Sequence, residues 1–150
     1  AIVFVTIFVT RAILASEKLY KIKGFVMQVR VYYEDTDIGG VVYYANYLKF
    51  CERARSEMFF ERGVSPIIEG GAFVVKSLKA EYIKSARFGD ILDVETKLSE
   101  LKGASALLSQ KIYRDGEPLF ECDVKLVFLK DAKPSKIPKA ALDILTLNRS

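Results

Sequence analysis

Apolar and polar residues alternate along several segments of the chain. Between residues 25 and 33 every odd position is apolar, and Gln28 and Arg30 lie at even positions. A period of two is typical of a strand with one buried face. The same alternation recurs in 91–101 and 118–129, and 72–84 and 103–113 are also predicted strands.

One segment follows the helical period instead. Its apolar residues are spaced i, i+3, i+4, i+7 and i+11, which places them on one face of a helix. They are Tyr47, Phe50, Cys51, Ala54 and Met58. Gly63 is positioned to end this helix, and Pro138 to open a short terminal helix that contains Leu142 and Leu145.

The order of these elements predicts an α+β fold. A first strand and one long helix precede about four strands, which we expect to form an antiparallel meander with a hairpin turn at Asp115-Gly116. A curved sheet wrapped around the helix would bury both apolar faces. A length of 150 residues suits one domain.

Composition and charge narrow the classes of function. The chain is 51% hydrophobic, as in a folded globular protein, and its net charge of +4 favours anionic ligands without indicating nucleic acid. The absence of histidine excludes Ser-His-Asp catalysis and histidine-ligated metals. Cys51 and Cys122 lack metal-ligand spacing, and we expect them to be buried free thiols in a reducing cytoplasm.

The first residues differ in character from the rest. AIVFVTIFVT is apolar but only ten residues long before Arg11, which is too short for a membrane span. A resemblance to a known family, carried by the motif within residues 30–55, begins at Met27. It implies an N-terminal extension of uncertain origin at 1–26 and a folded domain at 27–150, with Met27 as the natural start. An additional edge strand and the remains of a signal sequence are the alternatives.

Residues 30–55 carry the most specific pattern. A predicted strand leads into Glu34, Asp35 and Asp37, and a turn with Gly39-Gly40 precedes the helix. This order can place a carboxylate beside a helix N-terminus, whose backbone N–H groups can stabilise an oxyanion. Chemistry on an acyl carbonyl needs both elements.

The core of this stretch, D-T-D-x-G-G-V-V-Y-x-A-N-Y, is long enough to identify a family. From about Met27 to Pro138 the chain resembles the 4-hydroxybenzoyl-CoA thioesterase family, and within it the Tol-Pal-associated (YbgC-type) acyl-CoA thioesterase branch. The resemblance implies a hotdog fold and hydrolysis of a thioester. It also implies a homodimer or homotetramer with sites at the subunit interface.

Asp37 aligns with the aspartate that this family uses on the thioester. It would attack the acyl carbonyl as a nucleophile or activate a water as a general base, and the sequence leaves both open. The structural alternative is that Asp37 only shapes the glycine turn. Glu34 and Asp35 are expected to be solvated, and Glu57 on the helix is a remote second candidate for catalysis.

Tyr44 departs from the closest branch, which usually carries histidine at this position. The founding members of the family resemble this chain in having tyrosine there, and use the backbone N–H of that residue to polarise the thioester carbonyl. A backbone donor does not depend on its side chain. We therefore predict a catalytic role for the Tyr44 N–H, and its ring either packs or contacts substrate.

The substrate-binding candidates form two groups. Gly39, Gly40 and Val42 lie in the motif, and the glycines would let the backbone approach the substrate closely. Tyr33 aligns near the family's active site, although a core position is at least as plausible for its ring. Asn46 would bond near the helix start, most simply as a cap.

Basic residues are candidates for the phosphates of CoA. Arg87 follows a lysine-containing strand, and Lys133 lies in a basic tail with interspersed prolines. Both are weak candidates because isolated surface charges are ordinary.

Together these features predict a cytoplasmic acyl-CoA thioesterase without a metal or redox cofactor. It would cleave a short-chain or aromatic acyl-CoA, or an acyl carrier protein thioester, to a free acid and a thiol. CoA then enters only as part of the substrate. A non-catalytic acyl-CoA-binding module and a scaffold protein are the alternatives.

Overall fold

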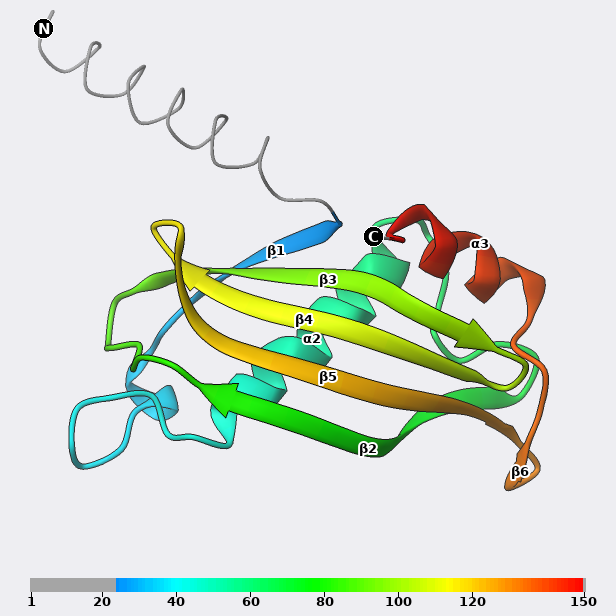
Figure 1. Cartoon of the computed structure of the whole chain (residues 1–150), viewed down its shortest axis with the longest axis horizontal. Coiled ribbons are helices and arrows are strands. Elements are labelled where there is room, and N and C mark those ends of the chain that lie inside the picture. The colour runs from blue at the N-terminus through cyan, green and yellow to red at the C-terminus, as the bar shows by residue number, and fades with distance from the viewer. Residues whose placement is uncertain (1–23, 150) are drawn as a thin grey trace, which may run out of the picture.

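The computed structural model describes residues 24–149, which form one antiparallel sheet with helices packed against it (Figure 1). The elements are β1 (Phe25–Arg30), the 3-10 helix η1 (Tyr33–Asp35), α2 (Asn46–Phe60), β2 (Gly71–Tyr82), β3 (Ile91–Lys102), β4 (Ser105–Arg114), β5 (Glu117–Lys130), β6 (Lys133–Pro134) and α3 (Lys139–Leu147). The part of the predicted extension from 1 to 23 lies outside the described residues, and β1 begins at Phe25.

The strand order is β1-β3-β4-β5-β2, with β6 paired to the far end of β5. Strands β3, β4 and β5 form the predicted antiparallel meander. The expectation that β2 continues it is wrong, because β2 pairs with β5 and lies at the opposite edge from β1 (Figure 1). Alternation predicts a strand but does not select its neighbour.

The turn between β4 and β5 is the predicted hairpin. Asp115 and Gly116 both have positive φ, 51° and 81°. Two consecutive positive φ values define the type I′ turn, whose twist matches that of the flanking strands. The Asp-Gly pair thus sets the register of β4 against β5.

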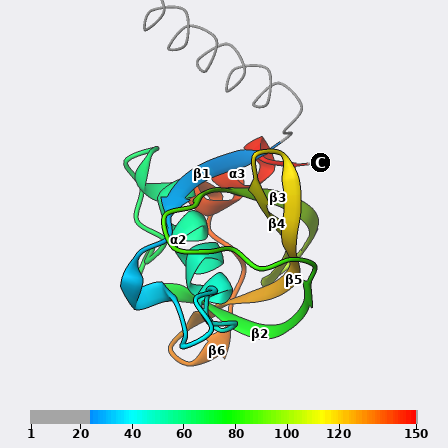
Figure 2. The same cartoon turned by 90° about the vertical axis from the view of Figure 1, so that its left-hand side faces the viewer.

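Helix α2 packs against β1 and β3 and lies on the concave side of the curved sheet (Figure 2). The residues of the predicted apolar face, from Tyr47 to Met58, are all buried. Helix α2 ends at Phe60, and Gly63 lies in the turn that follows: its φ is 69° and its N–H donates to the carbonyl of Phe60 over 2.9 Å, as is common for a glycine just after a helix.

Strand β2 keeps part of its apolar side uncovered. Leu78 pairs with Val124 and Tyr82 with Phe120, so both point to the side on which Val124 and Phe120 are buried. Leu78 is nevertheless 45% exposed and Tyr82 49%. The described residues therefore present an apolar stripe beside the outer edge of β2, which has no strand partner among them.

Neither α2 nor α3 is long and apolar enough to cross a membrane, and the same holds for every helix of the described part of the chain. The predicted short helix after Pro138 is α3, which buries Ala141, Ile144 and Leu145. It covers one end of the core.

Candidate active site

The loop of Asp37 is a closed turn. Its N–H donates to the carbonyl of Val41 over 2.9 Å, and Gly40 N–H donates back to the Asp37 carbonyl over 3.0 Å. The Asp37 Oδ1 accepts the N–H of Gly39 over 2.8 Å. The carboxylate thus does shape the turn, as the structural alternative predicted. Its second oxygen, Oδ2, has no hydrogen-bond partner among residues 24–149.

A buried hydrogen-bond cluster joins this region to helix α2. The carbonyl of Asp35 accepts the N–H of Tyr43 and the Nδ2–H of Asn46, each over 2.9 Å. The Asp35 Oδ2 accepts the N–H of Tyr32 over 2.8 Å. β1 ends at Arg30, three residues short of the predicted strand, and these bonds accompany the turn of the chain into η1.

Two expectations for this cluster are wrong. Asp35 is only 7% exposed rather than solvated, because its carboxylate satisfies the otherwise unpaired N–H of Tyr32. Asn46 does not cap α2, whose N-cap residue is Ala45. Its buried side chain donates to the carbonyl of Asp35 and so stabilises the loop. This position does not expose it to a substrate.

Tyr44 lies two residues before α2, next to the N-cap residue Ala45. Its N–H and that of Ala45 have no acceptor among the described residues, and both lie at the positive end of the helix dipole. The Tyr44 carbonyl accepts the Tyr82 hydroxyl over 2.9 Å. This bond ties the peptide to β2, while the Tyr44 ring is 62% exposed beside Tyr43, at 4.8 Å between centroids.

Tyr47 holds the segment around Ala86 against the site. Its hydroxyl oxygen accepts the N–H of Ala86 over 2.9 Å, and the carbonyl of Ala86 accepts the N–H of Val42 over 2.8 Å. Burial raises the pKa of the Tyr47 hydroxyl, against the hydrogen bond from Ala86, which lowers it. The neutral phenol therefore holds the 83–90 segment against both the loop and the helix.

These segments enclose a hollow of about 360 Å³. Three of the predicted site residues, Asp37, Val42 and Tyr44, lie on its wall, and the remaining lining residues are Val41, Tyr43, Tyr47, Tyr82, Ile83, Lys84 and Ser85. Sequence reasoning missed Tyr82, Ile83 and Ser85 as site residues. In the sequence these residues stand out only because they lie at or just after the end of a predicted strand. That position does not reveal that they line a hollow together with the Asp37 loop.

The other predicted binding residues lie around or away from this hollow. Gly39 and Gly40 belong to the exposed loop of Asp37, and Arg87 is bridged to that loop through Val41. Tyr33 is 81% exposed, so its predicted core position is wrong; its ring meets Phe88 at 4.9 Å between centroids.

Lys133 does not join the site. It lies in β6, at the opposite end of the sheet from the loops that carry Asp37 (Figure 1). Lys84 is the cation on the wall of the hollow, and its ammonium pairs with Glu117. This hydrogen bond lowers the pKa of the Glu117 carboxyl.

Cys51 and Cys122 are both buried and free, as predicted. Burial raises the pKa of the Cys51 thiol to about 12, so it is neutral and unreactive near pH 7. Within residues 24–149, no three His, Cys, Asp or Glu side chains gather as a metal site would require.

Comparison with known proteins places the chain in a class. The Thioesterase superfamily matches residues 39–121, which include the glycine turn, α2 and most of the sheet. A probable thioesterase of Bartonella henselae has the same fold, with a TM-score of 0.72 and 32% identity over 75% of this chain and 98% of that one. This chain belongs to the thioesterase superfamily, whose members share the hotdog fold.

Two bacterial relatives define the branch. The acyl-CoA thioesterase YbgC of Helicobacter pylori J99 is 43% identical over 80% of this chain and 98% of its own length. The acyl-CoA thioesterase YbgC of Haemophilus influenzae is 46% identical over 77% of this chain and 90% of its own. The resemblance stated from the glycine motif is thereby confirmed.

Proposed function

We propose that this chain is an acyl-CoA thioesterase in which Asp37 acts on the thioester carbonyl. One observation carries the proposal: Asp37 and Tyr44, whose N–H has no acceptor among the described residues, line the same hollow. Family membership and the YbgC relatives support the same reaction.

The chemistry follows from these two elements. Either Asp37 Oδ2 attacks the carbonyl carbon and expels the thiolate, giving a mixed anhydride that water hydrolyses, or it takes a proton from the attacking water. In both routes negative charge develops on the thioester oxygen. The N–H of Tyr44, with Ala45 beside it, would stabilise that charge from the helix N-terminus.

The walls of the hollow suggest where a substrate lies. Tyr43, Tyr44 and Tyr82 offer aromatic surface suited to a short-chain or aromatic acyl group. Gly39 and Gly40 permit close approach of the backbone. Arg87 lies next to the Asp37 loop and is therefore a better placed candidate for a CoA phosphate than Lys133. Among residues 24–149, no contact of Lys133, Tyr33 or Asn46 supports a role in binding.

The proposed functional unit is a homodimer or a dimer of dimers in the cytoplasm, where acyl-CoA or acyl carrier protein is the substrate. The uncovered apolar side of β2 and its unpaired edge support assembly through this strand. In that unit each sheet would wrap its own α2 as the central helix of the hotdog fold. Residues of the partner would then complete the hollow.

Release of free thiol from a panel of short, long and aromatic acyl-CoAs tests the proposal. Asp37→Asn should lower kcat by about 10²- to 10⁴-fold, because the amide is neither nucleophile nor base. Acyl-CoA binding should persist. Glu34→Gln, an exposed carboxylate of the same region, and Glu57→Gln should retain native turnover.

The remaining outcomes separate the alternatives. Native turnover by Asp37→Asn would place the chemistry elsewhere, with Glu57 next to test. Tight binding without thiol release from any acyl-CoA would favour a non-catalytic binding module. Single turnover in ¹⁸O-water then distinguishes the two roles of Asp37, because only the nucleophile route can put the label into its own carboxylate.

A further inference from the structure

Tyr82, the last residue of β2, joins the edge of the sheet to the peptide before α2. Its hydroxyl donates to the carbonyl of Tyr44 over 2.9 Å, although the two residues are 38 positions apart. Both residues line the hollow of the candidate active site. The bond therefore lies where charge would develop on the thioester oxygen.

The carbonyl of Tyr44 and the N–H of Ala45 belong to one peptide unit. Because a trans peptide is planar, its carbonyl and its N–H point in opposite directions, and a bond that fixes one fixes the other. A donor on the carbonyl also polarises the unit and makes its N–H a stronger donor. The Tyr82 hydroxyl thus acts on the Ala45 N–H without touching it, and this N–H has no acceptor among residues 24–149.

The neighbouring peptide is held in another way. The carbonyl of Tyr43 accepts the N–H of Asn46 over 2.9 Å, which fixes the Tyr44 N–H from within the first turn of the helix. Two successive N–H groups are therefore available to an oxyanion, and it is the second, on Ala45, whose peptide is held by β2.

Aromatic contacts hold the Tyr82 ring in position. The ring meets Phe120 at 5.0 Å and Tyr47 at 5.6 Å between centroids, in both cases edge to face. Tyr47 and Phe120 are buried and stack on each other at 5.1 Å. Burial raises the pKa of the Tyr82 hydroxyl above 10.0, so near pH 7 it keeps the proton that it donates.

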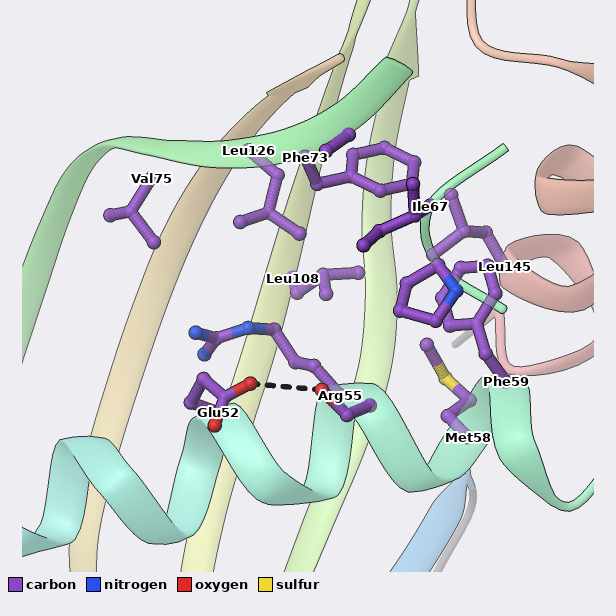
Figure 3. A pocket seen from close by; sticks show the side chains of 13 residues that line it. Glu52, Arg55, Met58, Phe59, Ile67, Phe73, Val75, Leu108, Leu126 and Leu145 are labelled. Carbon is purple, nitrogen blue, oxygen red and sulfur yellow. Dashed lines mark hydrogen bonds between the residues drawn. The ribbon is translucent and has the colours of Figure 1, made fainter. Parts of the chain in front are cut away.

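The body of α2 is held to the sheet without Tyr82. Arg55 points from the helix toward the sheet (Figure 3), and its NH1 donates to the Oε1 of Gln110 over 2.7 Å. The Nε2 of Gln110 donates to the carbonyl of Cys51, also on α2, over 2.9 Å. Loss of the Tyr82 hydroxyl should therefore release the peptide before the helix and leave the helix in place.

We propose that Tyr82 is a positioning residue for the reaction, a role that rests on the thioesterase function proposed above. Its hydroxyl orients and polarises the Tyr44–Ala45 peptide, so that the Ala45 N–H binds the oxyanion beside the Tyr44 N–H. The ring alone forms the wall of the hollow, so substrate binding does not need the hydroxyl.

Tyr82→Phe removes the hydroxyl and keeps the ring. With whichever of butyryl-CoA, lauroyl-CoA and benzoyl-CoA is cleaved fastest, kcat should fall about tenfold, because one oxyanion donor is loosened and not removed. KM and the urea midpoint should stay close to the native values. Tyr113→Phe removes a hydroxyl from β4, outside the hollow, and should retain native kcat.

Ala45→Pro removes the N–H itself. The φ of Ala45 is −71°, which proline adopts, so the backbone can keep its path. We expect kcat to fall about 10²-fold. In this background Tyr82→Phe should cost nothing further, because both changes act on the same N–H.

Infrared difference spectra give a readout that a purely structural role would not change. Asp37→Asn should bind the acyl-CoA without cleaving it, and the stretch of a ¹³C-labelled thioester carbonyl should move to lower frequency on binding, because the N–H donors polarise it. Adding Tyr82→Phe should reverse part of this shift at unchanged affinity. This measurement needs no turnover and stands even if Ala45→Pro fails to fold.

Three results would overturn the role of Tyr82. They are native kcat in Tyr82→Phe, losses that multiply in the double variant, and a carbonyl stretch that is the same with and without the hydroxyl. Absence of thiol release from the native chain would instead refute the proposed function, and the infrared shift would still show whether Tyr82 polarises the bound carbonyl.

Discussion

Gly39 and Gly40 are neighbours in the Asp37 loop but are required for different reasons. A Cβ on Gly39 would lie 3.1 Å from the Asp37 Oδ1, closer than ordinary contacts allow. A Cβ on Gly40 would meet no atom within 4 Å, yet its φ of 75° disfavours any L-residue. One glycine keeps the carboxylate in place, and the other keeps the backbone unstrained.

Alanine at these two positions should therefore separate activity from stability. Gly39→Ala should lower kcat by about tenfold, because displacing the carboxylate by a few tenths of an ångström spoils its attack geometry. Gly40→Ala should lower the free energy of unfolding by about 1–2 kcal/mol through the left-handed backbone. Thiol release and urea unfolding measure the two effects.

Each variant is the control for the other. Equal losses of turnover, with equal losses of stability, would show that the loop responds as one unit and that Gly39 has no particular relation to Asp37.

At the residue scale, the sequence identified part of the site. Asp37, Val42 and Tyr44 were predicted together and do line one hollow. Asp35 and Asn46 were misjudged, since their partners are backbone groups brought near by the turn at Tyr32 and by the start of α2. A polar side chain in sequence gives no sign of which buried group it will satisfy.

At the element scale, β2 is the edge strand whose outer side we expect to contact a second chain. Its outer edge lacks a strand partner among the described residues, and Val75, Leu78 and Tyr82 remain exposed. An apolar edge strand is a template for pairing with another chain. Dimerisation through β2 would remove both the unpaired edge and the apolar stripe.

Leu78→Asp should convert the native assembly to monomers and abolish turnover, because it buries a charge at the proposed interface. Light scattering on a size-exclusion column gives the mass. Leu147→Asp is the matched control, since Leu147 is also exposed but lies on α3, and it should keep the native mass. An unchanged mass in Leu78→Asp would place the interface on another element.

The whole molecule should lose stability at alkaline pH through a buried thiol. Burial raises the pKa of Cys51 from 9.0 to about 12, so the unfolded chain releases this proton first. The stabilisation is present in full below about pH 9 and is lost as pH rises toward 12. One proton changes the slope by about 1.4 kcal/mol per pH unit at most.

Urea unfolding between pH 8 and 10 measures this slope. Cys51→Ala should flatten it by about 1 kcal/mol per pH unit, apart from a constant loss from the small cavity. Tyr113→Phe is the control: burial raises the pKa of Tyr113 from 10.0 to about 12, so this variant should flatten the curve only above about pH 10. An unaltered slope in Cys51→Ala would mean that its thiolate is accommodated in the fold.

The sequence by itself determined the parts of this protein that depend on residues a few positions apart. These are the alternation of β3 and β5, the apolar face of α2, the turn at Asp115-Gly116 and the motif of Asp37. Each follows from backbone periodicity, turn chemistry or a contiguous pattern, which the chain carries locally.

Only the tertiary structure decided which distant segments meet. It put β2 beside β5, brought Tyr82 to the carbonyl of Tyr44, and joined Arg55 to Gln110 across the core. These contacts arise because the sheet must close over α2 and every buried polar group must find a partner. That requirement acts on the folded chain as a whole, so local pattern does not reveal it.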